Sequence, residues 1–178
     1  LLLSQIAAAT AVATTSAPAL RFRHYGVDVG MSSGFVNAIA RDRAGFLWLG
    51  TAFGLNRFDG HRFLVYRHAA SNPRSLPRDY VRHLLVAKDG RIWIGTEAGL
   101  SLFRPETDDF ESFLPGTYVR QISESPTGHL WLATNRGVTE FDPSGGRVVR
   151  EWRNDGNDPS SLSSDDVLFA YQDRERVL

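Results

Sequence analysis

Hydrophobic and polar positions along the chain follow one pattern that occurs three times. In each copy a valine precedes a tryptophan by twelve positions, and a glycine follows the tryptophan by six. The copies contain Val36, Trp48 and Gly54; Val81, Trp93 and Gly99; and Val119, Trp131 and Gly137. Because no insertion changes this spacing, each copy is expected to fold as one structural unit.

Each copy predicts four short strands. In the first copy they are Val36–Ala40, Leu47–Leu49, the residues after Gly54, and Phe63–Tyr66. The second strand is apolar on both pleat faces, which is typical of a strand covered from both sides. Two positions after the tryptophan lies a small residue with room for a bulky side chain from the next unit, namely Gly50, Gly95 or Ala133. Neighbouring units are therefore expected to stack face to face.

The period of the pattern indicates the architecture. Successive tryptophans are 45 and 38 residues apart, and periods of 40–50 residues are typical of propeller blades. We therefore predict an all-β chain of β-propeller blades, with about three complete four-stranded antiparallel blades and the start of a fourth in an incomplete ring. The predicted repeat region is 35–178, with blades over 35–66, 80–113 and 118–152 and a partial blade over 166–178.

The N-terminal region has a different composition. No charge occurs before Arg21, and Leu1 to Val12 is mostly Leu, Ile and Ala. An apolar run followed by small residues predicts a signal peptide over 1–19 with a clipped start, because the sequence begins without methionine. An uncleaved membrane anchor is the alternative, although polar residues dilute the run. Export to the periplasm follows from either interpretation.

Residues 20–34 are predicted to form a closing strand and a loop. Phe22 and Tyr25 have the spacing of the fourth strands, yet no other strand of a blade precedes them. An isolated strand of this kind can complete the last blade of a ring and so remove exposed sheet edges.

Composition excludes several function classes. The chain has 20 basic and 20 acidic residues and no cysteine, so no overall positive field attracts nucleic acid. Because the chain has no cysteine, it can form no disulfide framework, no thiolate metal site and no thiol nucleophile. No nucleic-acid partner is expected.

Motifs with catalytic or metal-binding potential fit simpler structural roles. Residues Gly30–Gly34 match the Gly-x-Ser-x-Gly string of a nucleophile elbow, but a strand follows where that motif requires a helix. Asn154–Asp158 lacks the ligand spacing of a calcium loop and is typical of a turn. The histidines show no zinc-ligand spacing; they are His24, His61, His68, His83 and His129. We therefore predict no catalytic, metal-binding or cofactor-binding residue and no cofactor.

Two sets of residues remain for structure and for ligand binding. Those predicted to pack between or within blades are Trp48, Trp93, Trp131, Gly50, Gly54, Gly95, Gly99 and Gly137. Polar side chains on predicted innermost strands can reach a central channel. The weak ligand-binding candidates of this kind are Arg82, His83, Arg120 and Gln121.

The repeat resembles the two-component regulator propeller repeat of bacterial periplasmic sensors. The resemblance rests on Val36-x-x-Ile39 and on the run from Asp42 to Asp59, which includes Trp48. The second copy has Arg104 for the final aspartate, and the third has Ala133 for the small glycine. The resemblance covers the chain from about Phe22 to Leu178.

The resemblance implies a non-catalytic, ligand-sensing propeller region outside the inner membrane. Such regions are joined through a membrane span to a histidine kinase or a diguanylate cyclase. The implied partners are an extracellular small molecule, glycan or peptide, and the remaining blades and output domain of the same chain; a homodimer of the parent is a further candidate. The alternatives left open are a propeller enzyme (a lyase, lactonase or quinone-dependent dehydrogenase) and a protein-interaction scaffold, because fold does not fix function.

Overall fold

The computed structural model describes residues 20–172, which contain three four-stranded antiparallel sheets. The first comprises β1 (Val36–Arg41), β2 (Leu47–Thr51), β3 (Gly54–Phe58) and β4 (Phe63–Tyr66). The second comprises β5 (Val81–Val86), β6 (Ile92–Thr96), β7 (Gly99–Arg104) and β8 (Asp109–Phe113). The third comprises β9 (Val119–Glu124), β10 (Leu130–Thr134), β11 (Gly137–Asp142) and β12 (Arg147–Trp152). A short 3₁₀ helix, η1 (Val27–Val29), precedes them. The predicted fold class is confirmed, and we refer to the sheets as blades 1, 2 and 3.

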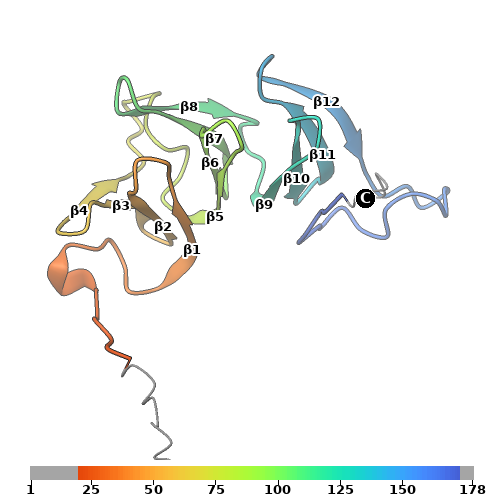
Figure 1. Cartoon of the computed structure of the whole chain (residues 1–178). Helices are drawn as coiled ribbons and strands as arrows, with labels where there is room; N and C mark the ends of the chain where they lie inside the picture. Colours follow the sequence, from red (N-terminus) through yellow and green to blue (C-terminus); the bar gives the residue numbers. More distant parts are fainter. Residues whose placement is uncertain (1–19, 173–178) are drawn as a thin grey trace, which may run out of the picture.

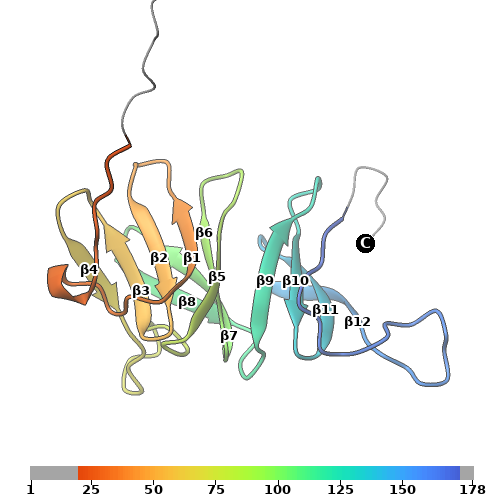
Figure 2. The same ribbon diagram turned by 90° about the horizontal axis from the view of Figure 1, so that it is seen from below.

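The blades are arranged as a fan (Figure 1). Strands β1, β5 and β9 lie at the centre, and β4, β8 and β12 lie at the periphery. Strand β5 contacts both β1 and β9. The turns that join β1 to β2, β5 to β6 and β9 to β10 share one end of the fan, here called the turn end (Figure 2). The connections between blades lie at the opposite end, here called the loop end.

A valine from each blade enters a slot in the blade before it. A Cβ built on Gly50 would lie 2.5 Å from Cγ1 of Val81, and one built on Gly95 would lie 3.1 Å from Cγ1 of Val119. In the third blade Val167 packs on the cluster that contains Ala133. Glycine or alanine at this position therefore sets how closely adjacent blades approach each other.

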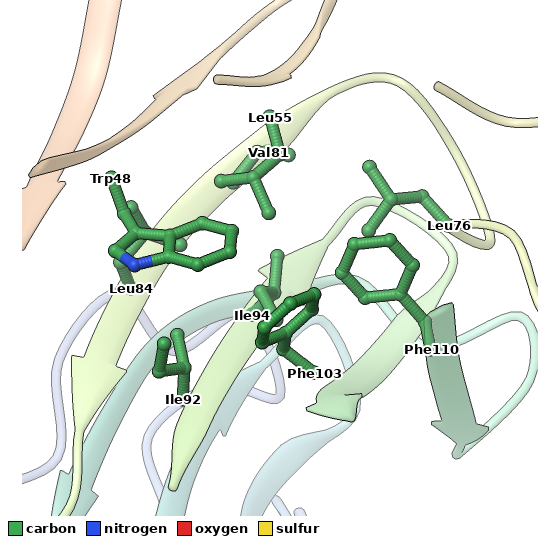
Figure 3. Packing of buried hydrophobic residues seen from close by; sticks show 9 residues of the cluster. All are labelled: Trp48, Leu55, Leu76, Val81, Leu84, Ile92, Ile94, Phe103 and Phe110. Atoms are coloured by element: carbon green, nitrogen blue, oxygen red, sulfur yellow. The ribbon is translucent and has the colours of Figure 1, made fainter. Parts of the chain in front are cut away.

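An aromatic layer fills the interface between blades 1 and 2 (Figure 3). Trp48 stacks on Tyr66 of its own blade and contacts Phe103 of blade 2, with ring centroids 5.9 and 4.7 Å away. The same buried cluster contains Leu76, from the connection between the blades, and Val81. Trp93 occupies the corresponding position between blades 2 and 3. The tryptophans thus bury apolar surface that a single four-stranded sheet would expose.

A threonine holds the β2–β3 turn, and sequence analysis gave it no role. Thr51 Oγ1 donates a hydrogen bond to the carbonyl oxygen of Gly54 at 2.9 Å and accepts one from the amide of Phe53 at 3.0 Å. Thr96 and Thr134 make the equivalent bonds in blades 2 and 3. The glycine ending the third of these turns, Gly137, has φ +100°, and a Cβ there would lie 2.0 Å from the carbonyl oxygen of Trp152. Only glycine fits this position.

Blade 1 leaves one face uncovered within residues 20–172. Ile39 is 65% exposed, whereas its counterparts Leu84 and Ile122 are 6% and 1% exposed because a preceding blade covers them. Phe22–Tyr25 forms no strand, and Tyr25 packs its ring edge-on against Phe58 at a centroid distance of 5.0 Å. The role of this segment as a closing strand in a complete ring stays a prediction.

The other predicted ends of the chain are only partly described. The signal peptide predicted over 1–19 lies outside the described residues. Residues 167–172 form no strand, yet they lie along blade 3. The amide of Val167 donates to the carbonyl of Thr134 at 3.0 Å, and Ser123 Oγ donates to the carbonyl of Ala170 at 3.0 Å. The remainder of the predicted fourth repeat lies outside the described residues.

The indole N–H groups of Trp48 and Trp93 differ in how they are satisfied. Trp48 Nε1 donates to Asp42 Oδ2 at 2.8 Å, and the same carboxylate accepts the amide of Phe46 at 2.9 Å. In blade 2, the position equivalent to Asp42 is occupied by Ala87. Trp93 Nε1 is buried and has no acceptor in the described part of the chain. An unsatisfied buried donor costs about 1–3 kcal/mol.

Ala87→Asp would supply an acceptor for Trp93 Nε1, but Ala87 is only 6% exposed and belongs to the buried cluster, so we expect a gain in the free energy of unfolding of at most about 1 kcal/mol. The measurement is the denaturant midpoint of the full-length protein. Asp42→Ala is the matched variant and should lower that midpoint by removing the same interaction from blade 1. An Ala87→Asp variant that is less stable than wild type would show that the acceptor position is not equivalent in the two blades.

Candidate functional site

The four residues predicted to reach a central channel lie at the start of inner strands. Arg82 and His83 belong to β5, and Arg120 and Gln121 belong to β9. The pairing register shifts between Val81 and His83, and it shifts again at the corresponding place in β9. This bulge interrupts the regular alternation of side chains. The side chains of Arg82 and Arg120 therefore have different surroundings from those of His83 and Gln121.

His83 and Gln121 connect neighbouring blades. The Nδ1 atom of His83 accepts the amide hydrogen of Ile122 at 3.3 Å, and burial lowers the pKa of the His83 imidazole. The side-chain oxygen of Gln121, a residue only 7% exposed, accepts the amide hydrogen of Ala170 at 3.1 Å. His83 thus satisfies a backbone group of the following blade, and Gln121 satisfies one of the segment that follows blade 3.

The two arginines lie near a tyrosine at the loop end. The guanidinium of Arg120 lies 4.7 Å from the ring centroid of Tyr118 and forms an ion pair with Asp166. Arg82 is exposed. Burial raises the pKa of the Tyr118 hydroxyl, and the positive charges of Arg82 and Arg120 oppose that rise, so both guanidinium groups act on the hydroxyl. We call Arg82, Tyr118 and Arg120 the axial mouth.

The chemistry of the axial mouth suits a polar ligand. Guanidinium groups present planar forks of N–H donors that match carboxylates and other oxygen-rich groups. The Tyr118 face adds a flat apolar surface, and Glu97 contributes a nearby negative charge. The described residues contain no group of three His, Cys, Asp or Glu side chains suited to a metal ion.

The serine of the Gly30–Gly34 string has a structural environment. Ser32 Oγ lies 2.9 Å from Thr51 Oγ1, and it accepts a hydrogen bond from Asn56 Nδ2 at 2.8 Å. The amide of Ser32 donates to Asn56 Oδ1 at 2.8 Å. These partners tie the segment before β1 to blade 1. They contain no base that could activate the serine as a nucleophile.

A groove of about 440 Å³ opens at the turn end between blades 1 and 2. It is lined by the rings of Phe46, Trp48 and Phe103 and by Arg57, whose guanidinium lies 5.2 Å from the Phe46 ring centroid and 5.6 Å from that of Trp48. Arg57 also forms a 3.0 Å ion pair with Asp108 of blade 2. Sequence analysis did not find this groove. Of the aromatic residues that line it, Trp48 was predicted as a packing residue, and Phe46 and Phe103 were given no role.

Two parts of the chain match the family model for the two component regulator propeller, over residues 30–53 and 75–98. Each match covers the loop before a blade and the first two strands of that blade. Residues 30–53 and 75–98 thus match two-component regulator propeller repeats. Because the matches begin at the connections that contain Met31 and Leu76, these connections are part of the repeat unit.

The propeller repeats are also found in longer signalling proteins. A 47-residue stretch is 45% identical to Histidine kinase P4 of Formosa agariphila and covers 26% of this chain and 3% of that protein. The extracellular domain of BT3049 from B. thetaiotaomicron, described as a hybrid two component system, is 27% identical and superposes with a TM-score of 0.71. That alignment covers 84% of this chain and 22% of the BT3049 domain. The chain thus spans a small part of each relative.

A weaker similarity shows only the fold. Virginiamycin B lyase from Staphylococcus aureus superposes with a TM-score of 0.51 at 15% identity, covering 66% of this chain and 40% of the lyase. Within residues 20–172, no helix has the length and hydrophobicity needed to cross a membrane.

Proposed function

We propose that the chain is part of the extracytoplasmic ligand-sensing propeller of a bacterial signal-transduction protein and performs no catalysis itself. The observation that carries this proposal is the similarity of 84% of the chain to the extracellular domain of a protein described as a hybrid two component system. The histidine kinase relative supports a histidine kinase as the output domain over a diguanylate cyclase. A periplasmic propeller anchored to the inner membrane through the parent chain fits both relatives.

The axial mouth is the proposed place of ligand binding. Arg82 comes from blade 2 and Arg120 from blade 3, while Asp166 follows blade 3, so a ligand there contacts several repeats. A small molecule, glycan or peptide with oxygen-rich groups would replace the exposed Asp166 carboxylate as the partner of Arg120. Signalling requires that the ligand bind two arrangements of the propeller unequally.

The proposal is tested by output measurements on the full-length protein. Kinase autophosphorylation or target transcription is compared across a panel of glycans, peptides and small acids for wild type and Arg82→Ala/Arg120→Ala. We expect one class of compound to change the output of wild type, and the double variant to need at least about tenfold more of it. Arg62→Ala, which changes an arginine with an 88% exposed side chain at the turn end, is the control.

Two results would contradict the proposal. An output that no panel compound changes would argue against ligand sensing. Chemical conversion of a panel compound by the purified propeller, followed by mass spectrometry, would instead show an enzyme.

A further inference from the structure

The groove between blades 1 and 2 differs from the corresponding place between blades 2 and 3. In blade 2, Arg91 occupies the repeat position of Phe46. Its guanidinium lies 5.5 Å from the centroid of the Trp93 ring, and its Nη1 donates to the carbonyl of Pro143 in blade 3 at 2.8 Å. A charged side chain therefore bridges blades 2 and 3 at this level. Phe46 cannot make such a bridge; the Arg57–Asp108 ion pair joins blades 1 and 2 instead, and a groove stays open beside it.

The interior of the groove is lined by aromatic and apolar side chains and by the Arg57 guanidinium, which lies over the Phe46 and Trp48 rings. Trp48 and Phe103 form its deep part, with ring centroids 4.7 Å apart, and Ile92 and Pro105 complete the side from blade 2. A closed apolar cavity of about 150 Å³ already accommodates one benzene ring. A groove of about 440 Å³ accommodates a ring with a short side chain. Stacked and edge-on contacts with aromatic walls favour an aromatic ring as the occupant.

Three arginines line the groove: Arg57 is paired with Asp108 and Arg91 with Asp89, which leaves the Arg43 guanidinium for an anion. Both carboxylate oxygens of Asp42 already accept N–H groups, and Asp89 is paired with Arg91 at 2.6 Å. Arg43 donates to the backbone carbonyl of Lys88 across the gap and forms no ion pair within residues 20–172. Its side chain lies over Gly90, where a Cβ would be 3.1 Å from Cδ of Arg43. The glycine thus holds the arginine at the mouth of the groove.

We infer that this groove binds a small aromatic carboxylate, with the ring on the aromatic wall next to the Arg57 guanidinium and the carboxylate on Arg43. The ligand would contact both blades, so binding stabilises the interface between them. The site lies at the turn end, opposite the axial mouth. Variants of Arg82 and Arg120 therefore leave it intact, and the two sites can be tested separately.

The internal repeat supplies the most informative variant. Phe46→Arg places in blade 1 the side chain that bridges blades 2 and 3, with the Pro105 carbonyl in the position of the Pro143 carbonyl. We expect this variant to close the groove at some cost in stability, because the new guanidinium lies beside Arg57, whereas Arg91 has Leu102 at the corresponding place. Arg43→Gln removes the charge at the rim and leaves the aromatic walls in place.

The test is titration calorimetry of the full-length protein with phenylacetate, with phenylacetamide as the neutral analogue of the same shape. We expect saturable phenylacetate binding and a higher melting temperature in its presence, at least about tenfold weaker binding of phenylacetamide, and a similar loss in Arg43→Gln. Phe46→Arg should abolish binding, and circular dichroism should show that the variant is folded.

Each of the opposite results would overturn the inference. These are the absence of saturable binding up to about 10 mM phenylacetate, equal affinity for phenylacetate and phenylacetamide, or unchanged binding in a folded Phe46→Arg variant. Should Phe46→Arg fail to fold, Arg43→Gln and the neutral analogue still decide the question.

Discussion

We expect Trp93→Ala to lower the free energy of unfolding by about 3–5 kcal/mol, the range for truncating a large buried aromatic side chain. Trp93 is fully buried and lies 5.8 Å from Phe113 and 5.9 Å from Phe141, measured between ring centroids. Phe141 belongs to blade 3, so the truncation leaves a cavity in the interface between blades. Urea unfolding of the full-length protein, followed by far-UV circular dichroism, gives the midpoint and the slope.

A conservative variant separates packing from hydrogen bonding. Trp93→Phe keeps most of the apolar surface and removes the indole N–H, which has no acceptor among the described residues. Its loss of stability should be less than half that of Trp93→Ala, because no hydrogen bond is broken. An unchanged midpoint in Trp93→Ala together with a loss of signalling would show that the tryptophan serves a ligand rather than the packing between blades.

Gly50→Leu should destabilise the protein by about 1–3 kcal/mol or more, because it fills the slot that receives Val81. Even a Cβ at Gly50 would lie 2.5 Å from Cγ1 of Val81, far inside van der Waals contact. Blades 1 and 2 must then separate or shift. The change should appear both as a lower thermal midpoint and as faster amide exchange in β1 and β5.

Gly156→Leu is the control for this substitution. A Cβ at Gly156 meets no described atom within 4 Å, and Gly156 has no positive φ. The same change in residue type should therefore leave the midpoint within about 0.5 kcal/mol of wild type. If Gly50→Leu is as stable as Gly156→Leu, the inference that blades 1 and 2 approach each other closely at Gly50 is wrong.

The repeat spacing was sufficient to predict the blades. In each copy the first strand begins at the valine and the second contains the tryptophan twelve positions later. This constant step requires a turn of constant length, and the structure shows the same pairing register from copy to copy. The small residue two positions after each tryptophan was informative for a physical reason: a residue without a bulky side chain inside a strand signals close approach of another element.

The orientation of the channel candidates could not be predicted from the sequence. Regular alternation would place Arg82 and His83 on opposite faces of β5, but a bulge between Val81 and His83 changes the local pairing. Sequence periodicity does not reveal a bulge, so the role of His83 as an acceptor for Ile122 was not predicted. Their assignment to ligand binding remains a prediction.

The groove was missed for a different reason. Its presence depends on one difference between equivalent positions, Phe46 in blade 1 and Arg91 in blade 2. The consequence appears only when the Arg91 side chain is seen to reach Pro143 on the neighbouring blade. A contact between residues 52 positions apart leaves no signal in the local pattern.

The central claim is that the repeats pack as successive propeller blades, with each valine inserted into the blade before it. Because residues 1–178 contain no cysteine, a disulfide within them can come only from an introduced pair. A Cβ on Gly95 would lie 3.4 Å from Cβ of Val119, close to the 3.5–4.5 Å of disulfides. We predict that Gly95→Cys/Val119→Cys forms an intramolecular disulfide under mild oxidation, seen by mass spectrometry of the digested full-length protein. The control pair Gly95→Cys/Val167→Cys should remain reduced, because Val167 packs with Ala133 and not with Gly95. The stacking of blades described here would be contradicted if both pairs were oxidised equally or if the Gly95→Cys/Val119→Cys pair formed no disulfide.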